Sequence, residues 1–341
     1  MSSRRRPVAI LAVDGGNSKL DAVLVGADGR VLGAARGRGA SFSPGEHDSS
    51  FEILTRTVRR AARAAGIDPD RGEIARVAVH CLAGADLPVD DRRLQKTLRE
   101  LGWSPRIVLR NDTFAVLRAG TDRTWGVAVV CGTGLNCAAV SPEGRIVRYA
   151  ALGEISGDGG GGDWLGLHAL RAAIRGRDLR GPHSALEREV PAHFGMRTPS
   201  EVMEAIYLGR IDHHRLTELP RLVFRASAAG DAAAGEIVDR LGDEIVAMVT
   251  SALRRLRMTR RDTAVVLGGG VARGRDPRLL ARIRDGVAAV APAARVSVVD
   301  APPVIGSALL GLDEIGARKG AYARVRSALT HDRIAAPRME S

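Results

Sequence analysis

The sequence predicts an α/β protein built from two similar domains, and three observations lead to this prediction. The chain has 341 residues, which is more than one ordinary hydrophobic core accommodates. A pattern of three short apolar strands joined by glycine-rich turns occurs twice, at residues 10–37 and 127–153. Outside these segments, short apolar strands alternate with segments of helical periodicity.

The repeated segment predicts the same three-stranded unit in both places. An apolar strand leads into a glycine-rich turn, and a second apolar strand follows. A tight turn containing Gly-Arg, at 29–30 and at 144–145, then leads into the third strand. Two such units, about a hundred residues apart, indicate a duplicated domain.

The remaining elements follow from apolar spacing and from glycine stops. In the first half we expect helices at 47–66, at 90–101 and from Asp112 onward, and strands at 74–81 and 106–110. Residues 163–258 are expected to be mostly helical, with one long helix at 231–258. The last part returns to alternation, with strands at 264–267 and 296–299 and helices at 276–290 and 303–312.

These elements define the expected domains. An N-terminal domain covers residues 1–118 and is completed by the helix at about 303–315. A C-terminal domain with a helical insertion covers residues 119–302. The basic segment 316–341 is expected to be a mobile tail.

The net charge of +12 raises the question of a nucleic-acid partner. All but three of the 51 basic residues are arginine, and they are spread through nearly every segment. The few aromatic residues, 3% of the chain, form no base-stacking platform. We therefore expect no nucleic-acid partner.

Segment lengths and cysteine spacing exclude further classes. No segment approaches the ~18 unbroken apolar residues that span a bilayer, and the apolar run at 8–13 is too short for a signal peptide. We therefore expect a cytoplasmic protein with no membrane partner. The three cysteines, Cys81, Cys131 and Cys137, have neither metal-ligand spacing nor the pattern of a disulfide framework.

The first glycine-rich turn, Asp14-Gly15-Gly16-Asn17-Ser18-Lys19, joins two predicted strands. A P-loop or a dinucleotide-binding turn would lead into a helix instead. Glycines let the backbone approach a ligand, so that successive N–H groups can hold phosphate oxygens. Asn17, Ser18 and Lys19 add side-chain donors, and Asp14 can hold Mg²⁺ through water. A glycine-rich hairpin without a ligand explains this turn equally well.

Two further glycine elements favour a nucleotide site. The second repeat contains Gly132-Thr133-Gly134-Leu135-Asn136, and a later strand ends in Gly268-Gly269-Gly270. Two glycine hairpins can hold the phosphates of one nucleotide, and residues without a Cβ let a purine and ribose approach closely. We therefore predict phosphate contacts at 132–134 and adenosine contacts at 268–270. A purely structural turn is the alternative for each element.

With these motifs the chain resembles the BadF/BadG/BcrA/BcrD ATPase family. The resemblance implies a two-domain, actin-like ATPase fold with ribonuclease H-like domains and the nucleotide in the cleft between them. It also implies ATP and Mg²⁺ as cofactors. It extends over roughly residues 8–315 and includes DGGNSK at 14–19, RNDTFAVL at 110–117, GTGLNC at 132–137, GEISGDGGGGDWLG at 153–166, TPSEVMEAIYLG at 198–209 and LGGGVA at 267–272.

The resemblance implies ATP-dependent phosphorylation of an amino sugar, with N-acetylglucosamine at its 6-hydroxyl as the first candidate. A kinase of glucosamine or glucose is one alternative. An ATPase activator of a 2-hydroxyacyl-CoA dehydratase is another, but its iron–sulfur cluster requires suitably placed cysteines. A small-molecule sugar is therefore the expected partner, and a homodimer is one of the assembly states left open.

Asp112 is the candidate catalytic residue. It follows a predicted strand and opens a predicted helix, and the carboxyl ends of strands are where α/β folds bind ligands. The resemblance implies that this carboxylate takes the proton from the sugar hydroxyl. An ordinary helix N-cap is the alternative role, since aspartate suits that position.

The resemblance also implies the residues that contact the sugar. The glycine-rich segment 153–166 is expected to be a mobile loop that closes over the substrate. It keeps an aspartate of the family at Asp158 and has Gly159 in place of a family glutamate. The expected sugar contacts are Ser41, Ser43, Gly84, Asn111, Asp112, Thr133, Asn136, Glu154 and Asp158.

Overall fold

The computed structural model describes residues 8–335 with the exception of residue 71. Residues 1–7 of the expected N-terminal domain and residues 336–341 of the expected tail lie outside the described residues. The chain divides into two compact units. Unit 1 consists of Met1–Ala128 and Val299–Ser341, and unit 2 consists of Val129–Val298.

Unit 1 contains a five-stranded sheet with the order β3-β2-β1-β4-β5. The pairs β1–β2 and β2–β3 are antiparallel, whereas β1–β4 and β4–β5 are parallel. The carboxyl ends of β1, β4 and β5 therefore lie at one edge of the sheet. The strands are β1 (Val8–Gly15), β2 (Lys19–Gly26), β3 (Val31–Arg38), β4 (Val77–Leu82) and β5 (Ile107–Arg110).

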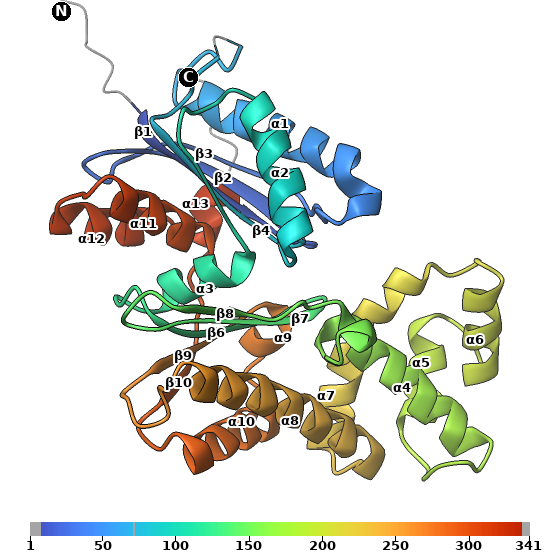
Figure 1. Ribbon diagram of the computed structural model, residues 1–341. Coiled ribbons are helices and arrows are strands. Elements are labelled where there is room, and N and C mark those ends of the chain that lie inside the picture. Colours follow the sequence, from blue (N-terminus) through green and yellow to red (C-terminus); the bar gives the residue numbers. More distant parts are fainter. Residues whose placement is uncertain (1–7, 71, 336–341) are drawn as a thin grey trace, which may run out of the picture. The chain divides into compact units, whose positions relative to one another are not determined.

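Side chains that alternate along β1 supply the two faces of this sheet. Leu11 and Val13 belong to the core cluster that includes α1 and α2, whereas Ile10 and Ala12 belong to the cluster that includes α11. Figure 1 shows α1 and α2 on one face and α11 and α12 on the other. The helices are α1 (His47–Ala64), α2 (Pro88–Glu100), α3 (Asp112–Gly120), α11 (Val304–Glu314), α12 (Lys319–Ala328) and α13 (His331–Ala335), with a 3₁₀ turn η1 at Pro44–Glu46.

Unit 2 repeats the strand order of unit 1. Its order is β10-β9-β6-β7-β8, so an antiparallel β7–β8 hairpin continues from β6, and β9 and β10 follow on the other side. This repetition confirms the predicted α/β fold with two similar sheets. The strands are β6 (Gly126–Cys131), β7 (Leu135–Val140), β8 (Ile146–Arg148), β9 (Ala264–Gly268) and β10 (Arg295–Val298).

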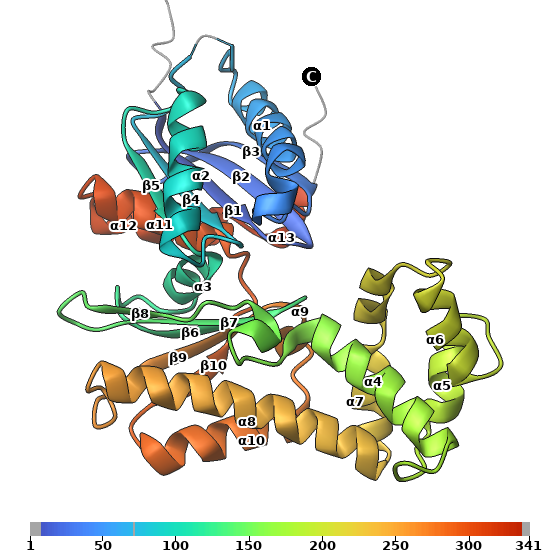
Figure 2. The same cartoon turned by 45° about the vertical axis from the view of Figure 1, so that its right-hand side comes forward.

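The helices of unit 2 form two groups. The long helix α8 packs along α10, and α4 to α7 form a cluster of shorter helices (Figure 2). The elements are η2 (Gly153–Ile155), α4 (Gly161–Arg177), α5 (Leu186–His193), α6 (Pro199–Tyr207), η3 (His213–Glu218), α7 (Pro220–Ala228), α8 (Ala232–Arg255), α9 (Gly270–Arg273) and α10 (Pro277–Val290).

The division between the units lies in β6, whereas the sequence places it at residue 118. The segment after α3 belongs with unit 1 because α12 holds it. Arg326 donates to the carbonyl of Thr121 at 3.0 Å and pairs with Asp122 at 3.1 Å.

The expected tail is a folded part of unit 1 over its described length, which corrects the expectation of a mobile segment at 316–335. Val325, Leu329 and Ile334 are at most 2% exposed and belong to the core cluster of α11. Ala321, Val325 and Leu329 are four residues apart, which places them on one helical face. The basic charge of this segment is typical of a solvated tail, but its apolar residues recur with helical spacing.

The glycine-rich segment 153–166 also differs from the expected loop, because its second half opens α4. Two glycines of α4 allow close packing. A Cβ at Gly161, whose φ is +87°, would lie 2.4 Å from the backbone of Gly134. A Cβ at Gly166 would lie 2.0 Å from the carbonyl oxygen of Leu216.

Candidate functional site

The first predicted phosphate turn closes the β1–β2 hairpin of unit 1. Asp14 and Gly15 end β1 and Lys19 begins β2, so Asn17 and Ser18 are exposed at the tip. The N–H of Gly16 donates to the carbonyl of Lys19 at 3.0 Å. A Cβ at Gly15 would lie 2.9 Å from the Leu82 side chain, so glycine is required where the turn meets the end of β4.

Asp14 is a buried carboxylate at the base of this turn, with 6% of its surface exposed. Burial raises its pKa well above the usual range, and the carboxylates of Asp21 and Asp112 raise it further. The cations of Lys19 and Arg36 act in the opposite direction. Arg36 is largely committed to Asp21, with two hydrogen bonds of 2.7 and 2.8 Å. Asp14 is therefore left under a negative potential that a cation would relieve.

The chain brings Asp112 to the same edge of unit 1, at the first turn of α3. The residue is partly exposed, and burial raises the pKa of its carboxyl group to about 6. The N–H groups of Thr113 and of Asp112 itself partly offset this rise. Such a carboxylate is ionised at neutral pH and basic enough to accept a proton.

Asn111, not Asp112, is the N-cap of α3. The Asn111 side chain accepts from the N–H of Thr113 at 3.0 Å and from the Thr113 hydroxyl at 2.6 Å. Its amide nitrogen donates to Asp86 at 2.8 Å. Asn111 was predicted to contact sugar, but it is 2% exposed and engaged at both ends of its amide. Asp86, which follows β4, is the partly exposed polar group there and was not among the predicted contacts.

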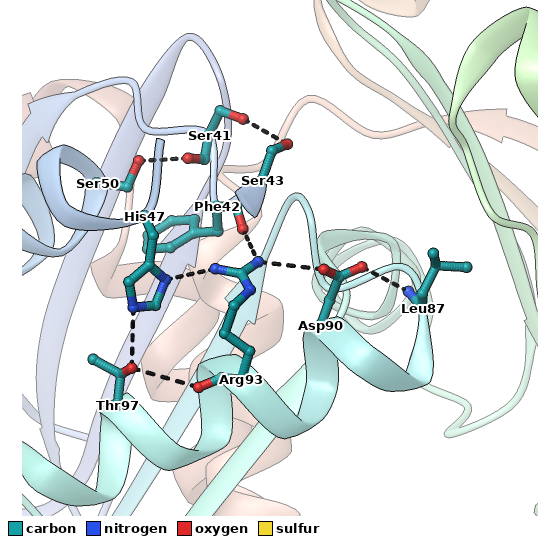
Figure 3. Close-up of polar contacts among 9 residues, drawn as sticks. All are labelled: Ser41, Phe42, Ser43, His47, Ser50, Leu87, Asp90, Arg93 and Thr97. Carbon is teal, nitrogen blue, oxygen red and sulfur yellow. Dashed lines mark hydrogen bonds and ion pairs between the residues drawn. The ribbon is translucent and has the colours of Figure 1, made fainter. Parts of the chain in front are cut away.

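Ser41 and Ser43 lie on the segment between β3 and η1 (Figure 3). The Ser41 hydroxyl donates to the Ser43 hydroxyl at 3.0 Å, and Ser43 is exposed. Gly84, with φ of +87°, supports this segment closely, since a Cβ there would lie 2.9 Å from the carbonyl carbon of Phe42. The first turn supports it as well, because the N–H of Ala40 donates to the carbonyl of Gly16 at 3.0 Å. The predicted residues of unit 1 therefore come together at one sheet edge.

In unit 2 the second predicted phosphate turn lies against the start of α4. The N–H of Gly162 donates to the carbonyl of Gly132 at 2.7 Å, and that of Asp163 donates to the carbonyl of Thr133 at 3.0 Å. Asn136, on β7, accepts from the N–H of Cys137 at 2.7 Å.

The third glycine element meets the same turn. Gly269 has φ of +94°, and a Cβ there would lie 2.3 Å from the carbonyl oxygen of Cys131. Gly268 ends β9 and Gly270 begins α9. The two predicted nucleotide elements of unit 2 are therefore in direct backbone contact.

The comparisons with known proteins agree with this arrangement. The family model described as the BadF/BadG/BcrA/BcrD ATPase family matches residues 11–311. The chain belongs to this ATPase family.

Curated relatives and a solved structure extend this result. An N-acetylmuramic acid/N-acetylglucosamine kinase of Clostridium acetobutylicum is 26% identical over 264 residues, covering 77% of this chain and 85% of the relative. An N-acetyl-D-glucosamine kinase of Dictyostelium discoideum is 23% identical over 273 residues, with the same coverage of 77% and 85%. A crystal structure assigned as an N-acetylglucosamine kinase of Chromobacterium violaceum superposes with a TM-score of 0.68 at 24% identity, covering 90% of this chain and 99% of that chain, and it shows the shared fold.

The expected sugar residues Glu154 and Asp158 of this ATPase line a cavity of about 530 Å³ in unit 2. Asp158 is 7% exposed, and its carboxylate accepts from the N–H of Gly153 at 3.2 Å. The opposite wall comes from α8 and includes Glu244, whose pKa is raised by burial and by the charge of Asp158.

Sequence reasoning missed the α8 residues of this cavity. They are Arg240, Asp243, Glu244 and Ala247. Their spacing of three and four residues places them on one face of a helix, but nothing in the sequence indicates which other residues that face contacts. Trp164 of α4 also lines the cavity, and the Arg240 guanidinium lies 5.2 Å from the centre of its ring.

The residues of this ATPase fit a weakly coordinated Mg²⁺ rather than a protein-enclosed metal. Among the residues that the structure describes, no three His, Cys, Asp or Glu side chains are grouped to hold a metal. Mg²⁺ bound to a nucleotide keeps several waters and takes one or two carboxylates from the protein. Asp14, buried and next to other carboxylates, suits that role.

The three cysteines are packing residues. Cys81, Cys131 and Cys137 are at most 1% exposed, and burial raises the pKa of Cys81 and of Cys131 to about 12. Such thiols stay protonated and cannot reach a partner chain.

Within the described residues, no helix is both long enough and apolar enough to cross a membrane.

Proposed function

We propose that this protein transfers the γ-phosphoryl group of ATP to an amino sugar, with the 6-hydroxyl of N-acetylglucosamine as the preferred acceptor. The curated relatives are phosphotransferases with an alcohol acceptor and carry the names of amino-sugar kinases. The observation that carries the proposal is Asp112, a carboxylate of raised pKa that stands beside an Asn111 N-cap at the carboxyl edge of the sheet.

Each unit offers glycine elements that suit a nucleotide. In unit 1, the backbone N–H groups of residues 15–18 and the ammonium group of Lys19 are suited to phosphate oxygens. In unit 2, residues 132–134 would bind phosphate, and Gly268, Gly269 and Gly270 would lie against the nucleoside. Asp14 would hold Mg²⁺, which when bound would supply positive charge to offset the charge of the phosphates.

The sugar would be recognised by hydroxyl and carboxylate groups. Ser41 and Ser43 of unit 1 offer neighbouring hydroxyls, and Glu154 and Asp158 of unit 2 offer carboxylates that accept from sugar hydroxyls. Thr133, Asn136 and the backbone at Gly84 complete the proposed set. Asn111 acts indirectly in this proposal, by holding Asp86 and the start of α3.

Asp112 performs the proton transfer in the proposed reaction. The sugar hydroxyl oxygen attacks the γ-phosphorus, and the bond from that phosphorus to the ADP oxygen breaks. The hydroxyl proton passes to the ionised carboxylate of Asp112 as the new bond forms. Positioning by the turns and serines supplies most of the remaining catalysis, as is usual in phosphoryl transfer.

An ATPase activator of a dehydratase is the second function considered. Its cluster would have to be held by cysteines at a subunit surface. Cys81, Cys131 and Cys137 are instead buried within the two units, so this function is disfavoured.

An ADP-release assay across a sugar panel tests the proposal. The panel contains N-acetylglucosamine, glucosamine, N-acetylmuramic acid and glucose, with 6-deoxy-N-acetylglucosamine as the matched control that lacks the proposed acceptor. We expect ADP release with N-acetylglucosamine and none with the 6-deoxy compound. ADP release that no sugar stimulates would contradict the kinase assignment, and equal release with the 6-deoxy sugar would contradict the acceptor position.

A further inference from the structure

Arg93 connects α2 to the segment that carries Ser41 and Ser43 (Figure 3). Its guanidinium group donates to the carbonyl oxygen of Phe42 at 2.5 Å and to Nδ1 of His47 at 2.5 Å. It also pairs with Asp90 at 3.3 Å. A guanidinium has five N–H donors in a planar fork, so one side chain can hold three acceptors at once.

The contacts of His47 determine the direction of the hydrogen bonds in this cluster. Arginine only donates, so Nδ1 of His47 accepts and its Nε2 carries the hydrogen. That hydrogen lies toward the hydroxyl of Thr97, at 3.1 Å, and Thr97 donates in turn to the carbonyl of Arg93 at 3.4 Å. Burial and the charge of Arg93 lower the pKa of His47, which keeps its ring neutral.

These contacts hold the main chain while leaving the two serine hydroxyls at the surface. The Phe42 ring is fully buried and lies 5.5 Å from the Phe51 ring, centre to centre. The Ser50 hydroxyl donates to the carbonyl of Ser41 at 2.5 Å. No strand or helix includes residues 39–43. These side-chain contacts, together with the backbone hydrogen bond from Ala40 to Gly16, therefore set the direction of Ser41 and Ser43.

We propose that Arg93 is a positioning residue for the sugar. It acts through the Phe42 carbonyl and through His47, and holds the hydroxyls of Ser41 and Ser43 where they meet the hydroxyls of the acceptor. The inference rests on the proposed sugar kinase function and goes beyond it. A misplacement of about 1 Å is enough to weaken such contacts substantially.

A role confined to stability would give a different pattern of kinetics. If Arg93 only stabilised unit 1, its loss would lower the melting temperature and leave the KM for both substrates unchanged in the folded fraction. If it positions the two serines, the KM for the sugar should rise while that for ATP stays constant. The split between the two KM values therefore separates the roles.

The test compares Arg93→Met with Arg92→Met in the full chain. Arg92 is the exposed neighbour of Arg93 on α2, so it controls for the loss of one positive charge. We expect Arg93→Met to raise the KM for the sugar at least tenfold, with the KM for ATP and kcat within twofold. Arg92→Met should behave as wild type.

His47→Leu alone makes the test independent of the folding of Arg93→Met. His47→Leu should raise the sugar KM in the same direction, and adding it to Arg93→Met should cause little further change, because both act through one network. Arg93→Lys, which keeps one donor, should fall between wild type and Arg93→Met.

Two outcomes would overturn the inference. One is an unchanged sugar KM in Arg93→Lys, His47→Leu and Arg93→Met. The other is a parallel rise of the KM for sugar and for ATP. Wild-type ADP release decides separately whether the kinase function holds, and its absence with every sugar would overturn both.

Discussion

At the scale of single residues, unit 1 divides two tasks between neighbours on the chain. Asn111 satisfies the N–H of Thr113 and holds Asp86, while Asp112 presents a carboxyl whose pKa is about 6. The capping role that the sequence left open for Asp112 therefore belongs to the preceding residue. Asp112 can therefore be substituted without losing the helix cap at Asn111.

Asp14 and Asp21 are buried carboxylates whose removal should have opposite effects on stability. The pKa of Asp14 is raised in the fold, so its stabilising contribution is present below its unfolded pKa and is lost as the pH rises. As the pH rises through this raised pKa, the charge of Asp14 increasingly opposes folding, so Asp14→Asn should raise the melting temperature at alkaline pH. Asp21→Asn instead breaks the bidentate pair with Arg36 and should cost about 3 kcal/mol.

Chemical denaturation of the two variants at pH 8 checks this prediction. Mg-ATP should raise the melting temperature of the wild type, and Asp14→Asn should lose most of that gain. Equal destabilisation by both substitutions would show that Asp14 is a structural carboxylate and not a ligand for the cation.

At the scale of elements, the glycine turns are positions where two backbones meet. Gly269 can be tested against its neighbour Gly270. Gly269→Ala would combine a positive φ with a Cβ 2.3 Å from a carbonyl oxygen, whereas a Cβ at Gly270 meets no atom within 4 Å. Gly269→Ala should cost more than ~2 kcal/mol and weaken nucleotide binding at least tenfold.

Nucleotide titration and thermal unfolding of both variants measure these effects. Gly270→Ala should keep the wild-type stability because the site opens a helix and leaves space for a methyl group. If Gly269→Ala binds nucleotide as well as the wild type does, this element is not part of the nucleotide site.

Some elements could be predicted because local chemistry determines them. The turns at 15–18 and 132–134 follow from glycines between apolar strands, and the cap at α3 lies where polar residues follow a strand. The sequence places Gly161 and Gly166 in a loop because glycine-rich segments are typical of loops. Glycine also allows two backbones to pack closely, and only the positions of Gly134 and Leu216 show that this is its use here.

The cluster around Arg93 could not be predicted from the sequence. Its partners Phe42 and His47 are 51 and 46 residues away along the chain. Neither helical spacing nor a motif links them, since they meet only because α2 and the segment after β3 pack beside one sheet. The α8 side of the cavity at Asp158 was missed for the same reason.

At the scale of the whole molecule, the C-terminal helices are part of the core of unit 1. Removal of residues 317–341 would expose the sheet face that Val325, Leu329 and Ile334 cover. Each of these side chains contributes ~1.5–3 kcal/mol by burial, so the truncation should cost on the order of 5 kcal/mol. That is enough to unfold a domain of ordinary stability.

Circular dichroism melting of the truncated chain measures this cost. A melting temperature equal to that of the full chain would show that α12 and α13 are dispensable and that this segment behaves as a tail after all.

The most direct test of the account is the pH dependence of turnover in wild type and in Asp112→Asn with the best sugar of the panel. A base must be ionised to act, so wild-type kcat should fall about tenfold per pH unit below pH 6 and be level above it. Asp112→Asn should lower kcat ~10²- to 10⁴-fold, with sugar binding and melting temperature kept because Asn111 still caps α3. Wild-type turnover in Asp112→Asn would contradict the assignment of Asp112 as the catalytic base.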